Sequence, residues 1–215
     1  LSLLDWDHLS LTSVDIRPRS EPAHRLVESE VRRYLSANLL ALDTKRLTSR
    51  LLAIPWIRDA RVRRVFPSSL RVEVTVRKPL AVLDKGVLLL VDAEGVLLGR
   101  AGIEDTLTLP LLADGKEFSE DFQKKMTLAR SCLESLPARL RRRIAAMDLS
   151  DPSCLSVVLR EESVRLLLGR EGFQAKLELY ERQAGSWVAS FGSLETVDFR
   201  VPDRTYLRPR RGGTD

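Results

Sequence analysis

PWIRDARVRRVFPSSLRVEVTVRKP, the stretch from Pro55 to Pro79, carries the clearest pattern in this chain. Between Leu70 and Val76 every second residue is apolar, and the residues between them are polar or charged. A period of two is typical of a strand that buries one face and turns the other toward water. The sequence therefore predicts a half-buried antiparallel strand here.

A second strand precedes this one. Ala60 and Val62 alternate with arginines, and Pro67–Ser69 supplies turn-forming residues between the two runs. Arg64 interrupts the alternation near the turn. The two runs predict a hairpin. A helix ends just before it, because Pro55 disfavours helical geometry in the residue that it follows.

The segment before the hairpin predicts one strand and two helices. Leu11–Arg17 is a first strand with imperfect alternation. A helix begins near Ser20–Pro22, where a capping hydroxyl and a proline suit a first turn, and its apolar residues recur at helical spacing as far as Leu35. Asp43 or Thr44 caps a second helix. The order is thus strand, helix, helix, strand, strand.

The pattern changes after Pro79, where short apolar runs separated by turn residues predict a meander of strands. Helical periodicity appears twice, in a helix from about Ser119 to Pro137 and in an aromatic-rich helix from Phe173 to Phe191. The other predicted segments are strands over 107–112, 145–149, 155–159, 164–168 and 196–201, and a solvated basic loop over 139–143.

These elements predict an α+β protein with two domains. The first, over residues 1–79, has two helices on a small mixed sheet. The second, over residues 80–202, has a mainly antiparallel sheet and two helices. Residues 203–215 read as a basic C-terminal tail.

The composition excludes several classes of protein. The chain has 215 residues, of which 44% are hydrophobic and 30% charged, so it is globular rather than disordered. It contains no apolar run near the roughly 20 residues that cross a bilayer. The net charge of +5 comes mostly from arginine. The sequence shows neither the base-stacking aromatic residues nor the recognition helix that nucleic-acid-binding surfaces usually have. We therefore expect no nucleic-acid partner.

No catalytic constellation is present in the sequence. The only histidines are His8 and His24, and no HExxH, GxSxG or phosphate-loop motif occurs. Glu161 and Glu162 form a carboxylate pair of the kind that glycoside cleavage needs, but their predicted turn offers no apolar pocket to raise either pKa. We expect neither enzymatic activity nor a cofactor.

Two cysteines, Cys132 and Cys154, are too few for a disulfide framework or a metal site. They are read as small buried apolar residues, and a disulfide between them remains the alternative.

The motifs described above, in their order and spacing, resemble the FtsQ/DivIB family of bacterial cell-division proteins and its N-terminal POTRA domain. The resemblance starts with the helix that ends at Pro55-Trp56, the basic strand, the aromatic-proline turn and the terminal Lys78-Pro79. It continues through Val91–Gly95, Leu109–Leu112 and Val197–Arg200, and so covers nearly the whole chain.

The resemblance implies a non-enzymatic scaffold of the division machinery, acting upstream of septal wall synthesis. It also implies a single span of the inner membrane before Leu1, with this region on the periplasmic side at the division septum. The chain starts without methionine and reads as a fragment or processed product.

The resemblance further implies a site for FtsB, which is itself paired with FtsL, at a C-terminal edge strand that binds an added strand. The matching residues are Val197, Phe199, Arg200 and Val201. Arg200 would bind an acidic side chain of the partner, and the alternative is a solvated edge charge. Pro202 departs from the family pattern and would end the pairing there.

A second surface is implied on the first domain, where Asp59, Val62 and Arg64 match contacts with an FtsK-type recruiter. Arg64 fits a strand end equally well. One alternative function is a POTRA module that assists outer-membrane protein insertion or secretion, which would need further repeats and a downstream barrel. Another is a wall-processing enzyme, which would show turnover of wall fragments.

Overall fold

The computed structural model describes residues 10–19, 21–35, 37–113, 121–151 and 153–210. The chain divides into two compact units, Leu1–Lys78 and Pro79–Asp215, and each has its own hydrophobic core.

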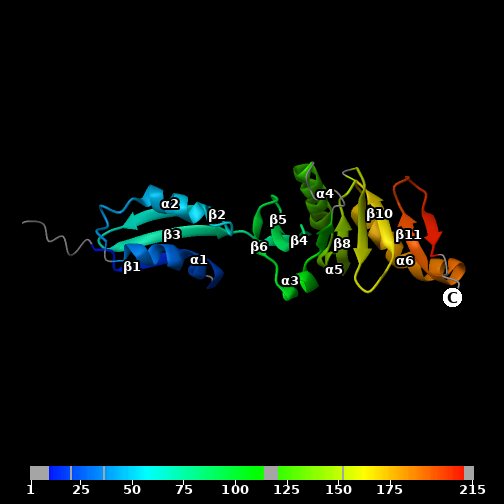
Figure 1. The fold of residues 1–215 in the computed structure, drawn as a ribbon, viewed down its shortest axis with the longest axis horizontal. Coiled ribbons are helices and arrows are strands. Elements are labelled where there is room, and N and C mark those ends of the chain that lie inside the picture. Colours follow the sequence, from blue (N-terminus) through cyan, green and yellow to red (C-terminus); the bar gives the residue numbers. More distant parts are fainter. Residues whose placement is uncertain (1–9, 20, 36, 114–120, 152, 211–215) are drawn as a thin grey trace, which may run out of the picture. The chain divides into compact units, whose positions relative to one another are not determined.

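The first unit places helices on one face of a three-stranded sheet (Figure 1). Strand β3 lies in the middle, parallel to β1 and antiparallel to β2. The strand–helix–helix–strand–strand order predicted from the sequence is confirmed. Its elements are β1 (Ser13–Arg17), α1 (Glu21–Val31), the 3-10 helix η2 (Arg32–Tyr34), α2 (Thr44–Leu52), β2 (Ile57–Val65) and β3 (Ser69–Val76).

Helical spacing explains the core of this unit. On α1, Val27 and Val31 lie one turn apart and both are buried. Helix α2 begins at Asp43, whose carboxylate accepts a hydrogen bond of 3.0 Å from the backbone N–H of Arg46. The apolar face of β3, which includes Leu70, packs beneath both helices.

Arg64 interrupts the alternation of β2 because its side chain fixes a loop. Its Nε donates to the carbonyl oxygen of Leu39 at 2.8 Å, and its Nη2 donates to that of Leu42 at 2.6 Å. Both carbonyls lie in the loop between η2 and α2. Arg64 therefore joins this loop to the hairpin. It also supplies hydrogen-bond donors to two loop carbonyl oxygens.

The second unit is built on a nine-stranded mixed sheet with the order β12-β11-β10-β9-β8-β7-β4-β5-β6 (Figure 1). Five neighbouring pairs are antiparallel and three are parallel. The elements are β4 (Pro79–Asp84), β5 (Leu88–Asp92), β6 (Leu97–Arg100), α3 (Ile103–Thr108), β7 (Leu111–Ala113), α4 (Phe122–Ser135), α5 (Ala138–Arg143), β8 (Ile144–Asp148), β9 (Leu155–Leu159), β10 (Arg165–Gly169), α6 (Phe173–Phe191), β11 (Leu194–Asp198) and β12 (Tyr206–Pro209).

The core of this unit lies between the sheet and helices α4, α5 and α6. Leu133 of α4 and Leu177 of α6 are buried against strand residues such as Val157 and Leu166. The two long helices and the α+β class predicted from the sequence are confirmed. Ser119, the expected start of the first long helix, lies outside the described residues.

Three segments differ from the sequence predictions. Residues 107–112 were expected to form a strand, but α3 includes Leu107 and only Leu111–Ala113 pairs as β7. The basic run 139–143 is not a loop but most of α5. The expected tail 203–215 contains β12, which pairs with β11. Each of these elements is short, so hydrophobic periodicity gives little signal for it.

Candidate partner-binding surfaces

The C-terminal edge of the nine-stranded sheet is β12, so the prediction of an edge strand at Val197–Val201 is wrong. Val197 lies in β11, between Leu166 of β10 and Leu207 of β12. A strand that is paired on both sides has no free backbone groups for a further strand. The error arose because β12 is short and lies between Arg204 and Arg210, and the sequence therefore read as a basic tail.

The four predicted site residues do not share one surface. Val197 is fully buried and Phe199 is nearly so. The Phe199 ring packs against Trp187 with ring centroids 6.3 Å apart, and its backbone N–H donates to the Leu167 carbonyl oxygen at 2.9 Å. Val201 is exposed, but it begins the turn that leads to β12. Val197 and Phe199 therefore belong to the core.

Arg200 already binds a carboxylate of its own chain. Its Nη2 lies 2.7 Å from Asp198 Oδ2 and its Nε lies 3.0 Å from Asp198 Oδ1. The hydrogen bond from the Arg200 side chain keeps the pKa of Asp198 below its usual value although partial burial opposes this, and the same bond raises the pKa of Arg200. The acidic group predicted on the partner is thus supplied by this chain.

Strand β12 offers a row of backbone groups on its outer side. In an antiparallel pair, alternate residues turn N–H and C=O toward the neighbouring strand. The Arg210 N–H donates to the Ser193 carbonyl oxygen at 2.8 Å, so Arg210 turns its backbone groups toward β11. By alternation, the backbone groups of Thr205, Leu207 and Pro209 point outward. Pro209 has no N–H and contributes only an acceptor. No strand among the described residues pairs with this side.

Exposed apolar side chains flank this edge. Tyr206 of β12 is 50% exposed, whereas the next residue, Leu207, packs partly into the core. At the end of α6, Val188 and Phe191 are 47% and 57% exposed. Phe191 comes two residues before Ser193, so the end of α6 adjoins the Arg210 end of β12. An added strand would therefore meet both backbone groups and apolar surface.

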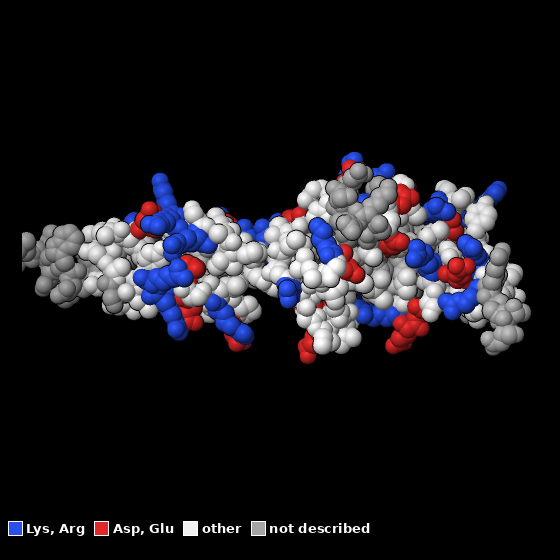
Figure 2. All heavy atoms as spheres, viewed as in Figure 1, with Lys and Arg blue, Asp and Glu red and all other residues white. Residues whose placement is uncertain are grey.

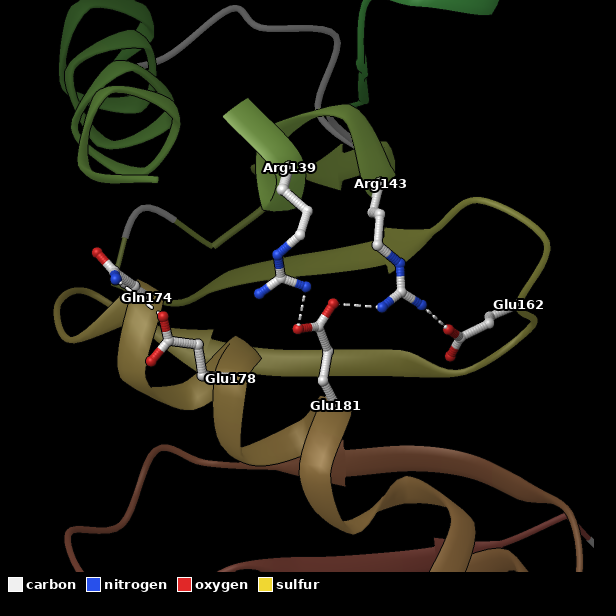
Figure 3. Close-up of polar contacts among 6 residues, drawn as sticks. All are labelled: Arg139, Arg143, Glu162, Gln174, Glu178 and Glu181. Atoms are coloured by element: carbon white, nitrogen blue, oxygen red, sulfur yellow. Dashed lines mark hydrogen bonds and ion pairs between the residues drawn. The ribbon is translucent and has the colours of Figure 1, made fainter. Parts of the chain in front are cut away.

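A charged cluster holds α6 in place (Figure 3). Glu181 on α6 accepts hydrogen bonds from Arg139 and Arg143 of α5. Arg143 also donates to Glu162 in the turn between β9 and β10, and the hydroxyl of Tyr180 donates to Glu162 at 2.6 Å. The cluster joins α5, α6 and this turn.

The cluster changes the titration of its members. Burial raises the pKa of Glu181, but the hydrogen bonds and charges of Arg139 and Arg143 outweigh it, so the pKa lies below its usual value. Burial and the hydrogen bond to Glu162 raise the pKa of Tyr180. Sequence patterns could not find this cluster, because Glu181 lies about forty residues from its two arginines.

The predicted residues of the first unit lie on β2, whose outer side has no neighbouring strand in the described part of the chain. Asp59 is exposed, and its carboxylate accepts a hydrogen bond of 3.0 Å from the Ala60 N–H. Val62 is half-buried against the core. Arg64 is committed to the loop carbonyls. Asp59, whose carboxylate lies 3.8 Å from Arg61 Nε in an exposed and therefore weak ion pair, and part of Val62 remain accessible to a partner.

The described residues include no group of three or more His, Cys, Asp and Glu side chains that could hold a metal ion. Cys132 is buried, and burial raises the pKa of its thiol to about 12. Cys132 and Cys154 are both free thiols, so the alternative of a disulfide is wrong. Within the described ranges, no helix combines the length and the apolar character that a membrane span requires.

Two family models match the chain and together cover most of it. The model described as "POTRA domain, FtsQ-type" matches residues 23–77, and the one described as "Cell division protein FtsQ/DivIB, C-terminal" matches residues 81–200. The first match falls within the three-stranded unit and the second within the nine-stranded unit.

Curated relatives named "Cell division protein FtsQ" agree with these matches. The protein from Anaeromyxobacter sp. is 30% identical over 83% of this chain and 65% of its own length. The proteins from Koribacter versatilis and Caulobacter vibrioides are each 26% identical, over 81% and 93% of this chain and 53% and 64% of their own. The chain thus spans between half and two thirds of these relatives. It belongs to the FtsQ/DivIB family of cell division proteins.

Proposed function

We propose that this protein is a non-enzymatic scaffold of the division machinery that recruits an FtsB-type partner, together with FtsL, by β-strand addition at β12. The family membership supports a role in division. The single observation that carries the site is the open outer side of β12 beside the exposed end of α6.

Backbone pairing supplies affinity in this mode of binding. The outward groups of Thr205 and Leu207 offer two donors and two acceptors, and Pro209 adds one acceptor. Each hydrogen bond contributes roughly 1 kcal/mol net. Such a short ladder gives weak binding by itself, so side-chain contacts with Tyr206 and Phe191 contribute much of the affinity.

The charge of this edge indicates the chemistry of the partner strand. Arg204, Arg208 and Arg210 lie in or beside β12, and among the described residues only Arg208 has an acidic partner, Glu195, at 3.2 Å. That ion pair is largely exposed and therefore weak. An acidic segment with apolar residues at alternate positions fits this edge, because carboxylates gain guanidinium partners and apolar side chains meet α6.

The location and the remaining partners follow from the family resemblance. The protein would be anchored in the inner membrane by a single span upstream, with this region on the periplasmic side at the septum. An FtsK-type recruiter would contact β2 at Asp59 and Val62, and septal wall synthesis would act downstream. The alternative, a module for outer-membrane protein insertion or secretion, has no specific support in the C-terminal unit, which matches the division family.

The test uses an unaltered chain and three synthetic versions of the partner's extracytoplasmic segment. One version is unmodified, and the other two carry backbone N-methyl groups on alternate residues. Strand addition predicts that one N-methylated version loses binding by about tenfold or more and the other keeps it, because only every second N–H faces β12. Equal binding by both N-methylated versions would exclude strand addition.

A further inference from the structure

One end of the first unit gathers three separate segments. The Leu11 N–H donates to the Ala37 carbonyl oxygen at 2.9 Å, and the Thr12 N–H donates to the Ser68 carbonyl oxygen at 2.9 Å. Arg64 adds its two bonds from the hairpin to the loop between η2 and α2. The chain therefore enters the unit at the same end where this loop and the β2–β3 turn lie (Figure 1).

This end exposes four large apolar side chains, and we call the surface that they form the tip. Leu35 is 46% exposed, Leu40 50%, Val65 36% and Phe66 61%. Among the described residues of the first unit, Leu52 is the only other large apolar side chain with comparable exposure. Single exposed apolar side chains are common on protein surfaces, whereas several at one end of a domain indicate an interaction site.

Cations lie beside each part of the tip. Arg32 and Arg33 precede Leu35 in the chain. Arg32 pairs with Glu28 at 2.7 Å, and Arg33 lies 4.0 Å from Glu30. Three further cations have no acidic partner among the described residues: Lys45, Arg46 and Arg63. On the face of the first unit drawn in Figure 2, Lys and Arg side chains gather with Asp and Glu side chains among them.

Two described acidic groups near the tip, Asp43 and Glu28, are already engaged. Asp43 caps α2, and Glu28 binds Arg32 at 2.7 Å. The surface therefore combines exposed apolar side chains with available cations. Leucine and phenylalanine enter the boundary between headgroups and acyl chains, and lysine and arginine bind the phosphates above it.

We propose that the tip docks onto a phospholipid surface that carries anionic headgroups. The proposal rests on the proposed function in one respect, since it takes the membrane anchor to lie upstream. The first described residues, from Ser10 to Thr12, join the unit at this end, so an upstream anchor would tether the unit from the side of the tip. The tethered tip therefore meets the membrane at a high local concentration, and weak contacts suffice to orient the unit.

Co-sedimentation of the purified chain with vesicles tests the proposal. Vesicles that contain phosphatidylglycerol should bind the chain, and vesicles of phosphatidylcholine alone should bind it several-fold less. Raising the salt concentration should weaken binding, because the cations are exposed. The double variant Leu40→Ser with Phe66→Ser should lose about tenfold in binding, and Lys45→Ser with Arg46→Ser should lose a similar factor.

The matched control is Ile103→Ser with Leu107→Ser, which removes two exposed apolar side chains from α3 and should leave vesicle binding unchanged. Binding of the partner segment should be unaltered in every tip variant, so a failure of the tip and a failure of the β12 site are distinguishable. Equal vesicle binding by the parent and the tip variants would overturn the proposal. Equal binding of the parent to both kinds of vesicle would also overturn it. The same holds if the tip variants lose capture of the partner segment but keep vesicle binding.

Discussion

At the scale of single residues, Phe199 and Arg200 show what a sequence motif can and cannot specify. The pattern of an apolar residue, Asp198, Phe199 and Arg200 predicts a strand near the C-terminus, and one is present, but β11 ends at Asp198. It does not reveal that Arg200 binds Asp198 of its own chain or that Phe199 packs on Trp187. Both contacts depend on how distant segments fold together, which alternation alone does not encode.

Phe199→Ala should act on stability rather than on binding. Removal of a ring that is only 4% exposed leaves a cavity beside Trp187 and should lower the free energy of unfolding by about 3 to 4 kcal/mol. Denaturant titration measures this change. Val201→Ala, in the exposed turn, should change the same free energy by less than about 0.5 kcal/mol. Similar effects of the two substitutions would contradict the burial of Phe199.

Arg200→Ala should leave capture of the partner segment almost unchanged. Its guanidinium is already bound to Asp198, so the variant loses an intramolecular ion pair that is about half exposed and worth up to about 1 kcal/mol. A binding assay beside a denaturant titration separates the two effects. A tenfold loss of capture without loss of stability would return Arg200 to the partner interface.

At the scale of elements, long periodic segments were predictable and short ones were not. The apolar stripes of α4 and α6 and the alternation of β2 and β3 identified these elements directly from the sequence. β12 has only four residues and α5 only six. Four of the residues of α5 are arginines, and Arg204 and Arg210 lie beside β12. Their pairing partners in β11 and α6 decide their structure, so local sequence indicated a tail and a loop.

Glu181→Gln tests the cluster that joins α5 and α6. The variant should be less stable by about 1 to 2 kcal/mol near neutral pH, because Arg139 and Arg143 lose a carboxylate that is mostly buried. The folded pKa of Glu181 is lowered, so its contribution is fully present above the unfolded pKa of about 4.3. It is lost as the pH falls through the folded pKa.

The stability difference between the parent and Glu181→Gln should therefore shrink below about pH 4. Glu178→Gln is the matched control, since Glu178 lies on the same helix and, among the described residues, accepts a side-chain hydrogen bond only from Gln174, at 2.9 Å (Figure 3). It should cost less than about 0.5 kcal/mol at either pH. A difference for Glu181→Gln that is constant from neutral to acidic pH would contradict the ion-pair account.

At the scale of the whole molecule, two separate cores indicate two units that can each fold by themselves. Each unit buries its own apolar residues, and β12 lies entirely within the second unit. The sequence indicated this division through the change of pattern after Pro79. It also indicated the α+β class and the family. It did not identify β12 as the edge strand, because a strand becomes an edge only through the final order of the sheet.

The second unit, produced alone as residues 79–215, should fold and capture the partner segment with an affinity within about twofold of the whole chain. Circular dichroism and a binding titration check the two parts of this prediction. A folded second unit that fails to bind would show that the first unit contributes to capture.

The central claim is that β12 receives a partner strand on its outer side, and amide hydrogen exchange at Leu207 tests it most directly. In the free protein the outward Leu207 N–H should exchange quickly, whereas that of Arg208, turned toward β11, is protected. On addition of the partner segment, exchange at Leu207 should slow by about tenfold or more, with Arg208 little changed. Saturation with the partner while Leu207 still exchanges at its free rate would contradict the account.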